Sequence, residues 1–450
     1  MTQNTSSLAC VVLAAGQGTR MKSDLPKVLH PVAGMPMIRH VLSACGALSP
    51  EAIVVVVAPE AKEVVEAVAP HRCVTQDKAR GTGDAVKAAR AELKDFTGDV
   101  VVLFGDSPLV TSNSLRLLQK KREETKACVV VAGFSPEDPA SYGRLVTDKN
   151  GHLSAIVEAS EASPAQLAIG LCNGGIMLFD GAKLWSLLDK LTDQNAKKEF
   201  FLTDCIALAQ QAGGSCAVVT IPVDEVLGVN NRIELAQAEK LMQKRLREKA
   251  MFGGATLIDP DTVFLSTDTK IGRDVTIGSN VVIGAGVEIG DRVDIRAFCA
   301  MENVRIESGA IIGPFARLRP GSVIGAGAHI GNFVEIKNSD IGRGAKVNHL
   351  SYVGDASVGA KANIGAGTIT ANFDGFRKSR THIGADASTG SNSVLVAPVN
   401  IGDGAYIGAG SVITNDVPAN ALAVARGRQA NLEDWARRMR EEKSAPKKDK

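Results

Sequence analysis

The sequence is poor in aromatic residues, which make up 4% of its 450 residues, and its charges are nearly balanced. With 51 lysines and arginines against 49 aspartates and glutamates, the net charge of +2 offers no basic surface for nucleic acid or an anionic membrane. No segment reaches the roughly 18 apolar residues that span a bilayer, and the N-terminus lacks the basic and apolar regions of a signal peptide. We therefore predict a cytoplasmic protein that binds neither nucleic acid nor membrane.

The sequence also lacks the closely spaced cysteine pairs that hold metal ions or redox-active disulfides. Its eight cysteines are scattered along the chain from Cys10 to Cys299. Such spacing predicts free, buried thiols. A chain of this length is too long for one hydrophobic core, so we expect two or more domains.

Glycine, in contrast, is abundant, with 45 residues, and many of these follow an aliphatic residue in a repeat of six. Between Ile271 and Ile413 an aliphatic residue returns at every sixth position, apart from one-residue slips. A helix repeats about every 3.6 residues and a strand about every two, so neither explains the six. Six residues fit a short strand and a corner, with the aliphatic side chain inward and glycine at the bend. Three such units would form one coil of about 18 residues, and stacked coils would bury a column of aliphatic side chains.

The first half of the chain follows another pattern, in which short apolar runs alternate with segments of helical spacing. Runs that are apolar at nearly every position are typical of strands covered on both faces, and hence of a parallel sheet. The expected strands are 8–15, 52–58, 100–104 and 128–134. Ligands of such sheets bind at the carboxyl ends of the strands, where the glycine-rich loop 16–21 could meet a phosphate with its backbone N–H groups.

That loop is neither of the two common phosphate-binding loops. Met21 stands where the dinucleotide fingerprint has its third glycine, and no Gly-Lys-Ser/Thr follows as in a P-loop. The longer string Leu13-Ala-Ala-Gly-Gln-Gly-Thr-Arg20-Met, followed by Pro26-Lys27-Val-Leu, resembles the motif of sugar-1-phosphate nucleotidyltransferases. The resemblance implies that Arg20 and Lys27 are catalytic and neutralise the charge that builds on the leaving pyrophosphate.

Further motifs match this family in the order of the chain. Asp106 ends an apolar strand and Asn230 precedes a predicted helix, and the resemblance makes them the ligands of a Mg²⁺ ion. The residues implied for the nucleotide and the sugar are Leu13, Ala14, Ala15, Gly16, Lys27, Gln76, Gly81, Thr82, Phe104, Gly105, Asp106, Gly143, Glu158, Asn173 and Asn230. Asp84 stands where the family usually has histidine, and Gly174 replaces a threonine.

A helix is expected to link the two halves of the chain. Asn231-Arg-Ile-Glu234 has the pattern of a capping box, and the apolar residues after it keep helical spacing. About 20 residues would give a rod of roughly 30 Å. We expect the charged residues of this helix to form a solvated face that includes Glu239, Lys240, Lys244, Arg245 and Arg247.

Several features interrupt the six-residue repeat and argue against a mere scaffold. Arginines stand in 313–321, a lysine ends 333–337, and a histidine lies within 348–352. One aliphatic position of the repeat is also missing between Ile364 and Ile383, which predicts a protruding loop at 371–376. A lone histidine on a β-coil is more often structural, but acetyl transfer to an amine needs a base, and histidine can supply one.

With these motifs in register, the chain from Leu8 to about Arg426 resembles the bacterial family of bifunctional N-acetylglucosamine-1-phosphate uridyltransferases and glucosamine-1-phosphate acetyltransferases. The resemblance implies that His349 is the general base. For glucosamine 1-phosphate it implies Arg319, Lys337, Tyr352 and Asn363. For acetyl-CoA it implies Ala366, Asn372, Phe373, Ser391, Ala409 and Arg426, with Phe373 where the family often has tyrosine.

The repeat gives a separate argument for the pair Arg319 and Lys337. Leu318 and Ile336 are one coil apart and should stack in the same column, so the residues after them project from one face, roughly 5 Å apart. Two unpaired cations at that spacing repel each other, and a sugar phosphate would turn the repulsion into attraction. We therefore predict a phosphate clamp whose removal leaves stability equal or higher. The alternative is a pair of solvated surface cations.

The sequence thus predicts three parts. Residues 1–232 would form a Rossmann-like nucleotidyltransferase domain with a mostly parallel sheet, and 233–253 a linker helix. Residues 254–450 would form a left-handed parallel β-helix of hexapeptide repeats, ending in a short charged helix after Trp435 and a solvated, Lys-rich tail. The left hand is implied by the resemblance, since the usual crossover rule favours the right hand.

These parts imply two reactions in one chain. Glucosamine 1-phosphate would be acetylated from acetyl-CoA in the β-helix, and the product would take a uridylyl group from UTP with Mg²⁺ in the first domain. The result would be UDP-N-acetylglucosamine, a precursor of peptidoglycan and lipopolysaccharide. The resemblance and the flat faces of a three-sided prism predict a homotrimer through the β-helix.

Two alternatives remain open at this stage. One is a nucleotidyltransferase whose β-helix only assembles the oligomer, and His349 with its neighbouring cations speaks against it. The other is a non-catalytic sensor of sugar nucleotides. The presence of Arg20, Lys27, Asp106 and Asn230 speaks against it.

Overall fold

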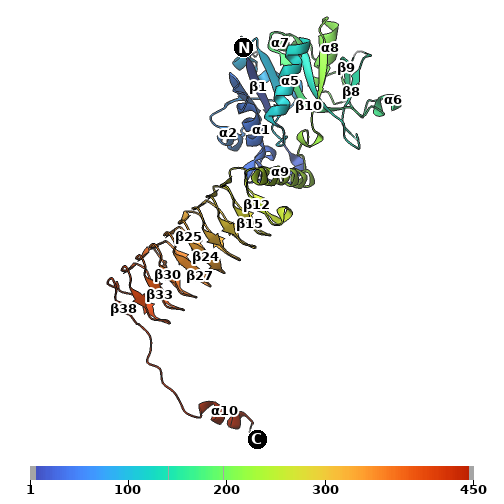
Figure 1. Cartoon of the computed structure of the whole chain (residues 1–450). Helices are drawn as coiled ribbons and strands as arrows, with labels where there is room; N and C mark the ends of the chain where they lie inside the picture. The colour runs from blue at the N-terminus through green and yellow to red at the C-terminus, as the bar shows by residue number, and fades with distance from the viewer. Residues whose placement is uncertain (1–6, 140, 150, 196, 445–450) are drawn as a thin grey trace. The chain divides into compact units, whose positions relative to one another are not determined.

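The computed structural model describes residues 7–139, 141–149, 151–195 and 197–444. The chain divides into two compact units (Figure 1). Unit 1 holds Met1–Glu248 together with Leu265–Thr267, and unit 2 holds Lys249–Phe264 together with Asp268–Lys450. Within the described ranges, no helix is long and apolar enough to cross a membrane.

Unit 1 is built around a nine-stranded sheet whose main path runs in the order β11-β7-β10-β6-β1-β4-β5. Neighbours on this path are parallel, except that β10 runs antiparallel to both β6 and β7. The strands of the path are β1 (Leu8–Ala14), β4 (Ala52–Val57), β5 (Arg72–Thr75), β6 (Asp99–Phe104), β7 (Val129–Phe134), β10 (Cys172–Asp180) and β11 (Cys216–Thr220). The four apolar runs expected as strands are present, which confirms the mostly parallel sheet.

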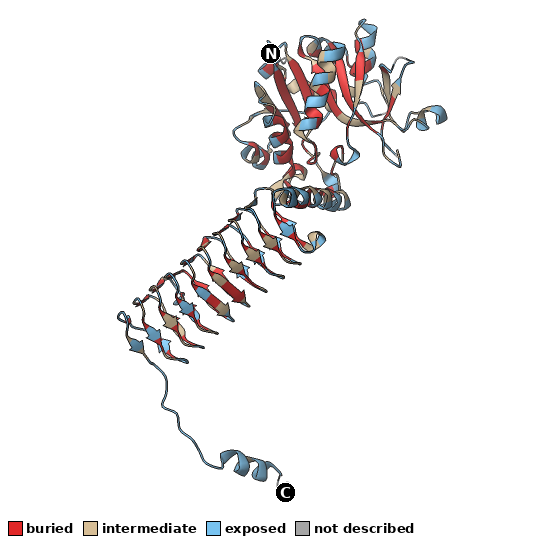
Figure 2. Cartoon of the chain, in the orientation of Figure 1, coloured by how far each residue is buried: buried red, intermediate tan, exposed pale blue. Residues whose placement is uncertain are grey.

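Helices cover both faces of this sheet, and the buried strands are red in Figure 2. One face packs against α1 (Met37–Gly46), α2 (Lys62–Val68) and α5 (Ser112–Thr125). The other packs against α3 (Thr82–Ala88), α4 (Arg90–Leu93), α7 (Gly181–Asp189) and α8 (Cys205–Gln211). Successive residues of β1 alternate between the two cores, so every position of the strand is buried and apolar.

Smaller elements complete unit 1, among them β2 (Pro31–Val32), β3 (Met35–Pro36), β8 (Arg144–Thr147), β9 (Leu153–Val157) and α6 (Pro164–Leu167). All eight cysteines of the chain are free, and all but the half-buried Cys73 are buried, as the spacing predicted.

The predicted linker is helix α9 (Arg232–Phe252), and Asn231 caps it. The Asn231 side chain accepts from the N–H of Glu234, while the Glu234 carboxylate accepts from the N–H of Asn230 instead of closing the usual box. The expected solvated face is wrong in part. Arg247 is buried, and Arg245 donates to the Leu109 carbonyl across 2.6 Å, because this part of α9 packs against a cluster in unit 1.

Unit 2 is a parallel β-helix whose coils stack along one axis (Figure 1). Sheet I contains β12 (Thr256–Leu257), β15 (Thr276–Ile277), β18 (Asp294–Ile295), β21 (Ile311–Ile312), β24 (His329–Asn332), β27 (Lys346–His349), β30 (Asn363–Ile364), β33 (Ser388–Thr389), β36 (Tyr406–Ile407) and β38 (Leu422–Ala423). Sheet II contains β13 (Phe264–Leu265), β16 (Val282–Ile283), β19 (Ala300–Met301), β22 (Arg317–Leu318), β25 (Glu335–Lys337), β28 (Tyr352–Gly354), β31 (Ile369–Ala371), β34 (Val394–Val396) and β37 (Val412–Ile413). Sheet III contains β14 (Lys270–Ile271), β17 (Glu288–Ile289), β20 (Val304–Ile306), β23 (Ser322–Ile324), β26 (Asp340–Ile341), β29 (Ala356–Val358), β32 (Thr381–Ile383) and β35 (Val399–Ile401).

The residues of the six-residue repeat point inward and, apart from the half-buried Ile271, are buried, as predicted. The predicted gap in the repeat before Ile383 is wrong, because no inward-pointing position is missing there. Thr370 fills that position in β31 with 1% of its surface exposed, and its hydroxyl donates to the Gly354 carbonyl across 3.0 Å. The inserted loop follows β31 and does protrude, with Phe376 92% exposed.

Beyond the coils lies helix α10 (Trp435–Ser444), which confirms the predicted short charged helix. The residues of α10 are almost all exposed. The Lys-rich tail predicted after it lies outside the described residues.

Candidate active sites

The first candidate site lies in unit 1, at the carboxyl ends of the neighbouring strands β1 and β6. Leu13 pairs with Phe104, and the N–H of Gly105 donates to the Leu13 carbonyl across 2.9 Å. The glycine-rich loop leaves β1 at this point. Gly18 in the loop has a φ of 63°, and a Cβ there would lie 2.5 Å from the Cβ of Lys27. Only glycine therefore lets the loop pack against the segment that carries Lys27.

Lys27 joins the two predicted metal ligands. Its ammonium forms an ion pair with Asp106 and donates to Oδ1 of Asn230 across 3.2 Å. The Asp106 carbonyl accepts from the N–H of Val229 across 2.9 Å, which brings the next residue, Asn230, beside the carboxylate. The two side-chain oxygens thus converge on one cation, and such hard oxygen donors suit Mg²⁺. The residues therefore fit a divalent cation, with the Lys27 ammonium in its place.

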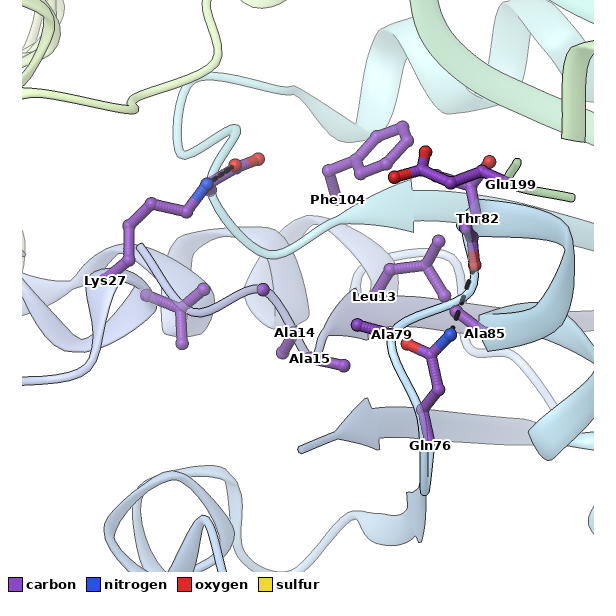
Figure 3. Close-up of a pocket in the computed structure, with 14 residues that line it drawn as sticks. Leu13, Ala14, Ala15, Lys27, Gln76, Ala79, Thr82, Ala85, Phe104 and Glu199 are labelled. Atoms are coloured by element: carbon purple, nitrogen blue, oxygen red, sulfur yellow. Dashed lines mark hydrogen bonds and ion pairs between the residues drawn. The ribbon is translucent and has the colours of Figure 1, made fainter. Parts of the chain in front are cut away.

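A cavity of about 330 Å³ opens beside this cluster (Figure 3). Ten of the residues predicted for the nucleotide line it, namely Leu13, Ala14, Ala15, Gly16, Lys27, Gln76, Gly81, Thr82, Phe104 and Asp106. Figure 3 shows Lys27 and Gln76 toward opposite ends, with Ala14 and Ala15 between them. The cavity is thus cationic at one end and carries an amide at the other.

Glu199 also lines this cavity and was missed by the sequence analysis. Its segment packs over the loop at Gly81: the N–H of Gly83 donates to the Phe200 carbonyl across 2.8 Å, and the N–H of Leu202 donates to the Thr82 hydroxyl across 3.0 Å. No local motif marks Glu199, because tertiary packing alone brings its segment to the loop.

A second cavity, of about 590 Å³, shares Phe104 and Asp106 with the first. Three further predicted residues line it: Arg20, Asn173 and Asn230. The start of α9 contributes Glu234 and Gln237. Arg20 therefore approaches the Asp106 cluster from this second cavity and is absent from the described lining of the first.

Two predicted sugar contacts, Gly143 and Glu158, lie beside each other but are not among the described residues that line either cavity. A Cβ at Gly143 would come 3.6 Å from Oε1 of Glu158, and the Gly143 carbonyl accepts from the N–H of Asn173 across 2.8 Å. They therefore flank a lining residue. The unusual Gly174 has a steric reason, because a Cβ there would lie 2.8 Å from a methyl group of Val226.

The second candidate site lies in unit 2, along the corner between sheets I and II. His349 ends β27 at this corner. Backbone N–H groups of one coil donate to carbonyls of the coil before it across 2.7–3.1 Å, and Arg426 Nη1 donates to the Ala409 carbonyl across 2.8 Å. These bonds connect a row over successive coils, which consists of His349, Ala366, Ser391, Ala409 and Arg426. The predicted base and four of the residues predicted for acetyl-CoA thus form one line, hereafter the corner row.

Asn332 orients the imidazole of His349. The two residues pair across β24 and β27, and Nδ1 of His349 lies 2.8 Å from Oδ1 of Asn332. An amide oxygen only accepts hydrogen bonds, so Nδ1 carries the proton and Nε2 keeps its lone pair. The sequence analysis missed Asn332, although its place 17 residues before His349 puts it one coil away.

Lys337 ends β25 and Arg319 directly follows the neighbouring strand β22, and the two strands pair in the expected register. The prediction that these two cations are unpaired and repel each other is wrong, however, because each has a carboxylate beside it. Arg319 Nη1 lies 2.8 Å from Oε1 of Glu335, and Lys337 Nζ lies 3.9 Å from Oδ2 of Asp355. The hydrogen bond to Glu335 raises the pKa of the Arg319 guanidinium. Glu335 and Asp355 therefore each accept the charge of one cation, so neither Arg319 nor Lys337 is unpaired.

The protruding loop adds further groups beside Lys337. Asn372 donates to Asp355, and Nδ2 of Asn338 donates to the other carboxylate oxygen across 2.6 Å. Burial alone would raise the pKa of Asp355, but these hydrogen bonds and the Lys337 ammonium hold it below its usual value. Lys378 lies later in the loop and was missed by the sequence analysis; its neighbour Lys337 lowers the pKa of Lys378.

The residues predicted for acetyl transfer are not all brought together within one chain. Asn363 begins β30 in sheet I, whereas Arg319, Lys337 and Tyr352 lie on sheet II. Asn372 and the exposed Phe373 stand at the edge of sheet II opposite the corner row. Apart from Asn363, the predicted residues therefore fall into two groups, one toward each edge of sheet II.

Fold and sites together define a chain with two transferase domains, one a nucleotidyltransferase and the other a hexapeptide-repeat acyltransferase. The family described as MobA-like NTP transferase domain matches residues 10–203, and the family described as bacterial transferase hexapeptide (six repeats) matches 268–302, 303–338 and 380–415. The chain belongs to the GlmU family of bifunctional proteins. It is 56% identical over 444 residues to the bifunctional protein GlmU of Paramagnetospirillum magneticum, which covers 98% of this chain and 99% of the relative. The GlmU protein of Rhodospirillum rubrum is 55% identical, and the match covers 96% of this chain and 97% of that protein. The GlmU protein of Zymomonas mobilis is 49% identical, and the match covers 97% of this chain and 98% of that protein.

This membership confirms the predicted family, the left-handed β-helix of hexapeptide repeats and the pair of reactions. The chain is a bifunctional enzyme, with a metal-dependent uridyltransferase in its nucleotidyltransferase domain and an acetyltransferase in its hexapeptide domain. Its hexapeptide repeats indicate that it forms oligomers. The sensor and scaffold alternatives are thereby excluded.

Proposed function

We propose that Lys27, Asp106 and Asn230 form the centre at which N-acetylglucosamine 1-phosphate takes a uridylyl group from UTP. The base of UTP would lie at the Gln76 end of the first cavity and its triphosphate at the Lys27 end (Figure 3). The sugar phosphate would occupy the second cavity. The observation that carries this assignment is the convergence of one ammonium and two side-chain oxygens at Asp106, a residue that both cavities share.

In this reaction a phosphate oxygen of the sugar phosphate attacks the α-phosphorus of UTP, and the bond to pyrophosphate breaks. A Mg²⁺ ion held by Asp106 and Asn230 would neutralise charge on the phosphates. With those oxygens engaged, the Lys27 ammonium becomes available to the triphosphate. Arg20, which lines the second cavity, would stabilise the same negative charge from the other side.

For acetyl transfer we propose His349 as the general base. The amino nitrogen of glucosamine 1-phosphate attacks the thioester carbonyl of acetyl-CoA, and Nε2 of His349 takes the proton from that nitrogen. The C–S bond then breaks, the proton passes to the sulfur, and CoA leaves as the thiol. In the neutral imidazole, the hydrogen bond from Nδ1–H to Oδ1 of Asn332 leaves the lone pair on Nε2, the atom that takes the proton. The corner row would bind acetyl-CoA together with Asn372 and Phe373, and the sugar phosphate would bind Arg319, Lys337, Tyr352 and Asn363.

The functional domains we propose are 1–232, the linker helix 233–253, and 254–450. The substrates UTP and acetyl-CoA, together with the free thiols, support a cytoplasmic location. The product would supply the synthesis of peptidoglycan and lipopolysaccharide.

A two-stage assay of the purified protein tests the proposed pair of reactions. Release of the CoA thiol from acetyl-CoA and glucosamine 1-phosphate is measured first, and pyrophosphate release is followed after UTP and Mg²⁺ are added. We expect both products, with pyrophosphate appearing only once acetylated sugar phosphate is present. Absence of CoA release would contradict the acetylation step, and absence of pyrophosphate with added N-acetylglucosamine 1-phosphate would contradict the uridylylation step.

Replacing Arg319 with alanine should raise the KM for glucosamine 1-phosphate by about tenfold or more, because a bidentate charge-assisted contact to phosphate is lost. The KM for acetyl-CoA should stay nearly unchanged. Since Arg319 pairs with Glu335, the melting temperature should stay equal or fall slightly. Arg305→Ala, at an exposed ion pair on sheet III, is the matched control. Unchanged sugar-phosphate kinetics in both Arg319→Ala and Lys337→Ala would rule out the clamp.

A homotrimer would complete the acetyltransferase site, because its residues lie at two edges of sheet II in each chain. Three aromatic side chains near the corner row, Phe298, Phe315 and Phe333, form an exposed stack with ring centroids 4.9 and 5.0 Å apart. An exposed apolar row of this kind favours burial against another copy. Multi-angle light scattering should give three times the chain mass of 47.1 kDa. A stable monomer at assay concentration would contradict the trimer.

A further inference from the structure

The amide of Gln76, at the end of the first cavity away from Lys27, is held in a definite orientation. Gln76 is 7% exposed, and its Nε2 lies 3.2 Å from the Gly81 carbonyl oxygen and 3.0 Å from Oδ2 of Asp84. The other oxygen of Asp84 accepts from Nη2 of the exposed Arg80 across 3.2 Å. A carbonyl oxygen and a carboxylate therefore flank one end of the amide.

The chemistry of these two neighbours decides which end of the amide faces them. A backbone carbonyl and an ionised carboxylate accept hydrogen bonds and cannot donate them. An amide turned the other way would place its oxygen against two acceptors, and both N–H groups would lose these partners. Nε2 therefore faces Gly81 and Asp84, and Oε1 faces the opposite side. Figure 3 shows that oxygen on the side of Ala79, another residue that lines the cavity.

We propose that Asp84 is a positioning residue for base selection, which locks Gln76 so that only an acceptor, Oε1, meets the nucleotide base. The proposal rests on the assignment of this cavity to a nucleoside triphosphate. A base presented to Oε1 must carry an N–H, as uracil and thymine do at N3. Cytosine presents a bare nitrogen acceptor at the same position, so it would face the oxygen without a hydrogen bond. The group that sets the amide in this chain is thus the carboxylate of Asp84.

The selectivity predicted by this orientation can be measured on the unmodified protein. Pyrophosphate release is followed with N-acetylglucosamine 1-phosphate, Mg²⁺ and three nucleotides in turn: UTP, CTP and 3-methyluridine 5′-triphosphate, whose methyl group replaces the N3 hydrogen. We expect kcat/KM to be at least about 100-fold lower for CTP and for the methylated nucleotide, because a site built to bind an N–H strongly rejects analogues that lack it. Equal use of the methylated nucleotide would overturn the proposal. Failure to use UTP at all would instead contradict the proposed function.

The role of Asp84 is then tested with Asp84→Asn, which keeps the size of the side chain but supplies a donor as well as an acceptor. The Gln76 amide can then turn, so the KM for UTP should rise about tenfold with kcat little changed, and the preference for UTP over CTP should fall about tenfold or more. Arg80→Ala is the matched control, because it removes the ion pair of Asp84 and leaves the Gln76 contact in place.

A purely structural role for Asp84 predicts a different pattern. Asp84→Asn would then lower kcat, or the melting temperature, with UTP and CTP affected equally, and that result would overturn the proposal. Release of CoA by the acetyltransferase domain reports in each sample that the chain has folded. If Asp84→Asn folds poorly, Asp84→Ala with the same three nucleotides gives the same comparison.

Discussion

Replacing His349 with alanine is expected to slow acetyl transfer to glucosamine 1-phosphate by about 10²- to 10⁴-fold, the usual contribution of a positioned general base. The reason is local. His349 is exposed at the end of β27, Nδ1 is bound by Asn332, and Nε2 keeps the lone pair that must take the proton. Uridylyl transfer, measured as pyrophosphate release, should keep the rate of the parent protein, because its proposed residues lie in unit 1.

His329→Ala is the matched control for this experiment. His329 lies on β24, one coil before His349 and on the same sheet, and no substrate contact is proposed for it. It should acetylate within a few-fold of the parent protein. The acetylation rate of Asn332→Ala should lie between the rates of His349→Ala and His329→Ala. The pH dependence of its kcat/KM should shift, since the imidazole loses the partner that selects its tautomer. Near-parental acetylation by His349→Ala would mean that the base lies elsewhere.

Asp106→Asn should lower uridylyl transfer by about 10³-fold or more, which corresponds to about 4 kcal/mol of transition-state stabilisation. The substitution keeps the size of the side chain but removes the carboxylate that would hold the metal ion and that now pairs with Lys27. Binding of Mn²⁺ to the free protein, followed by electron paramagnetic resonance, should weaken as well. This second measurement does not depend on turnover.

Asp99→Asn supplies the comparison for Asp106→Asn. Asp99 begins strand β6, which Asp106 follows, so the same chemical change is made at the far end of one strand. It should leave uridylyl transfer and Mn²⁺ binding near the parental values. Acetyl transfer should be unaffected in both variants. An equal loss of both activities in Asp106→Asn would speak against two separate sites.

Several features of this protein could be predicted from the sequence because they depend on residues close together in the chain. The six-residue spacing of aliphatic side chains predicted the coils, since each coil offers its neighbours the same environment. The apolar runs predicted four of the strands in the sheet of unit 1 within a residue of their ends, and the glycine-rich string with Lys27 predicted the loop after β1. The motif around His349 likewise marks the corner at which the predicted base and four residues predicted for acetyl-CoA lie.

Contacts between residues far apart in the chain could not be predicted from local sequence patterns. Periodicity placed Arg319 above Lys337, but the ion pairs with Glu335 and Asp355 depend on where long side chains reach across coils. Likewise, the apolar pattern of β10 did not reveal that it runs antiparallel, because a strand buried on both faces has the same composition in either direction.

The sequence by itself therefore determined the two architectures, the pair of reactions and most of the candidate residues. Only the tertiary structure decided how these residues are held. It brought Asp106, Asn230 and Lys27 to one point, set Asn332 against His349, and placed Glu199 in the lining of the first cavity. It also separated most of the residues predicted for acetyl transfer into groups toward the two edges of sheet II. The physical reason is that periodicity and motifs depend on neighbouring residues, whereas hydrogen-bond partners depend on register and packing between distant segments.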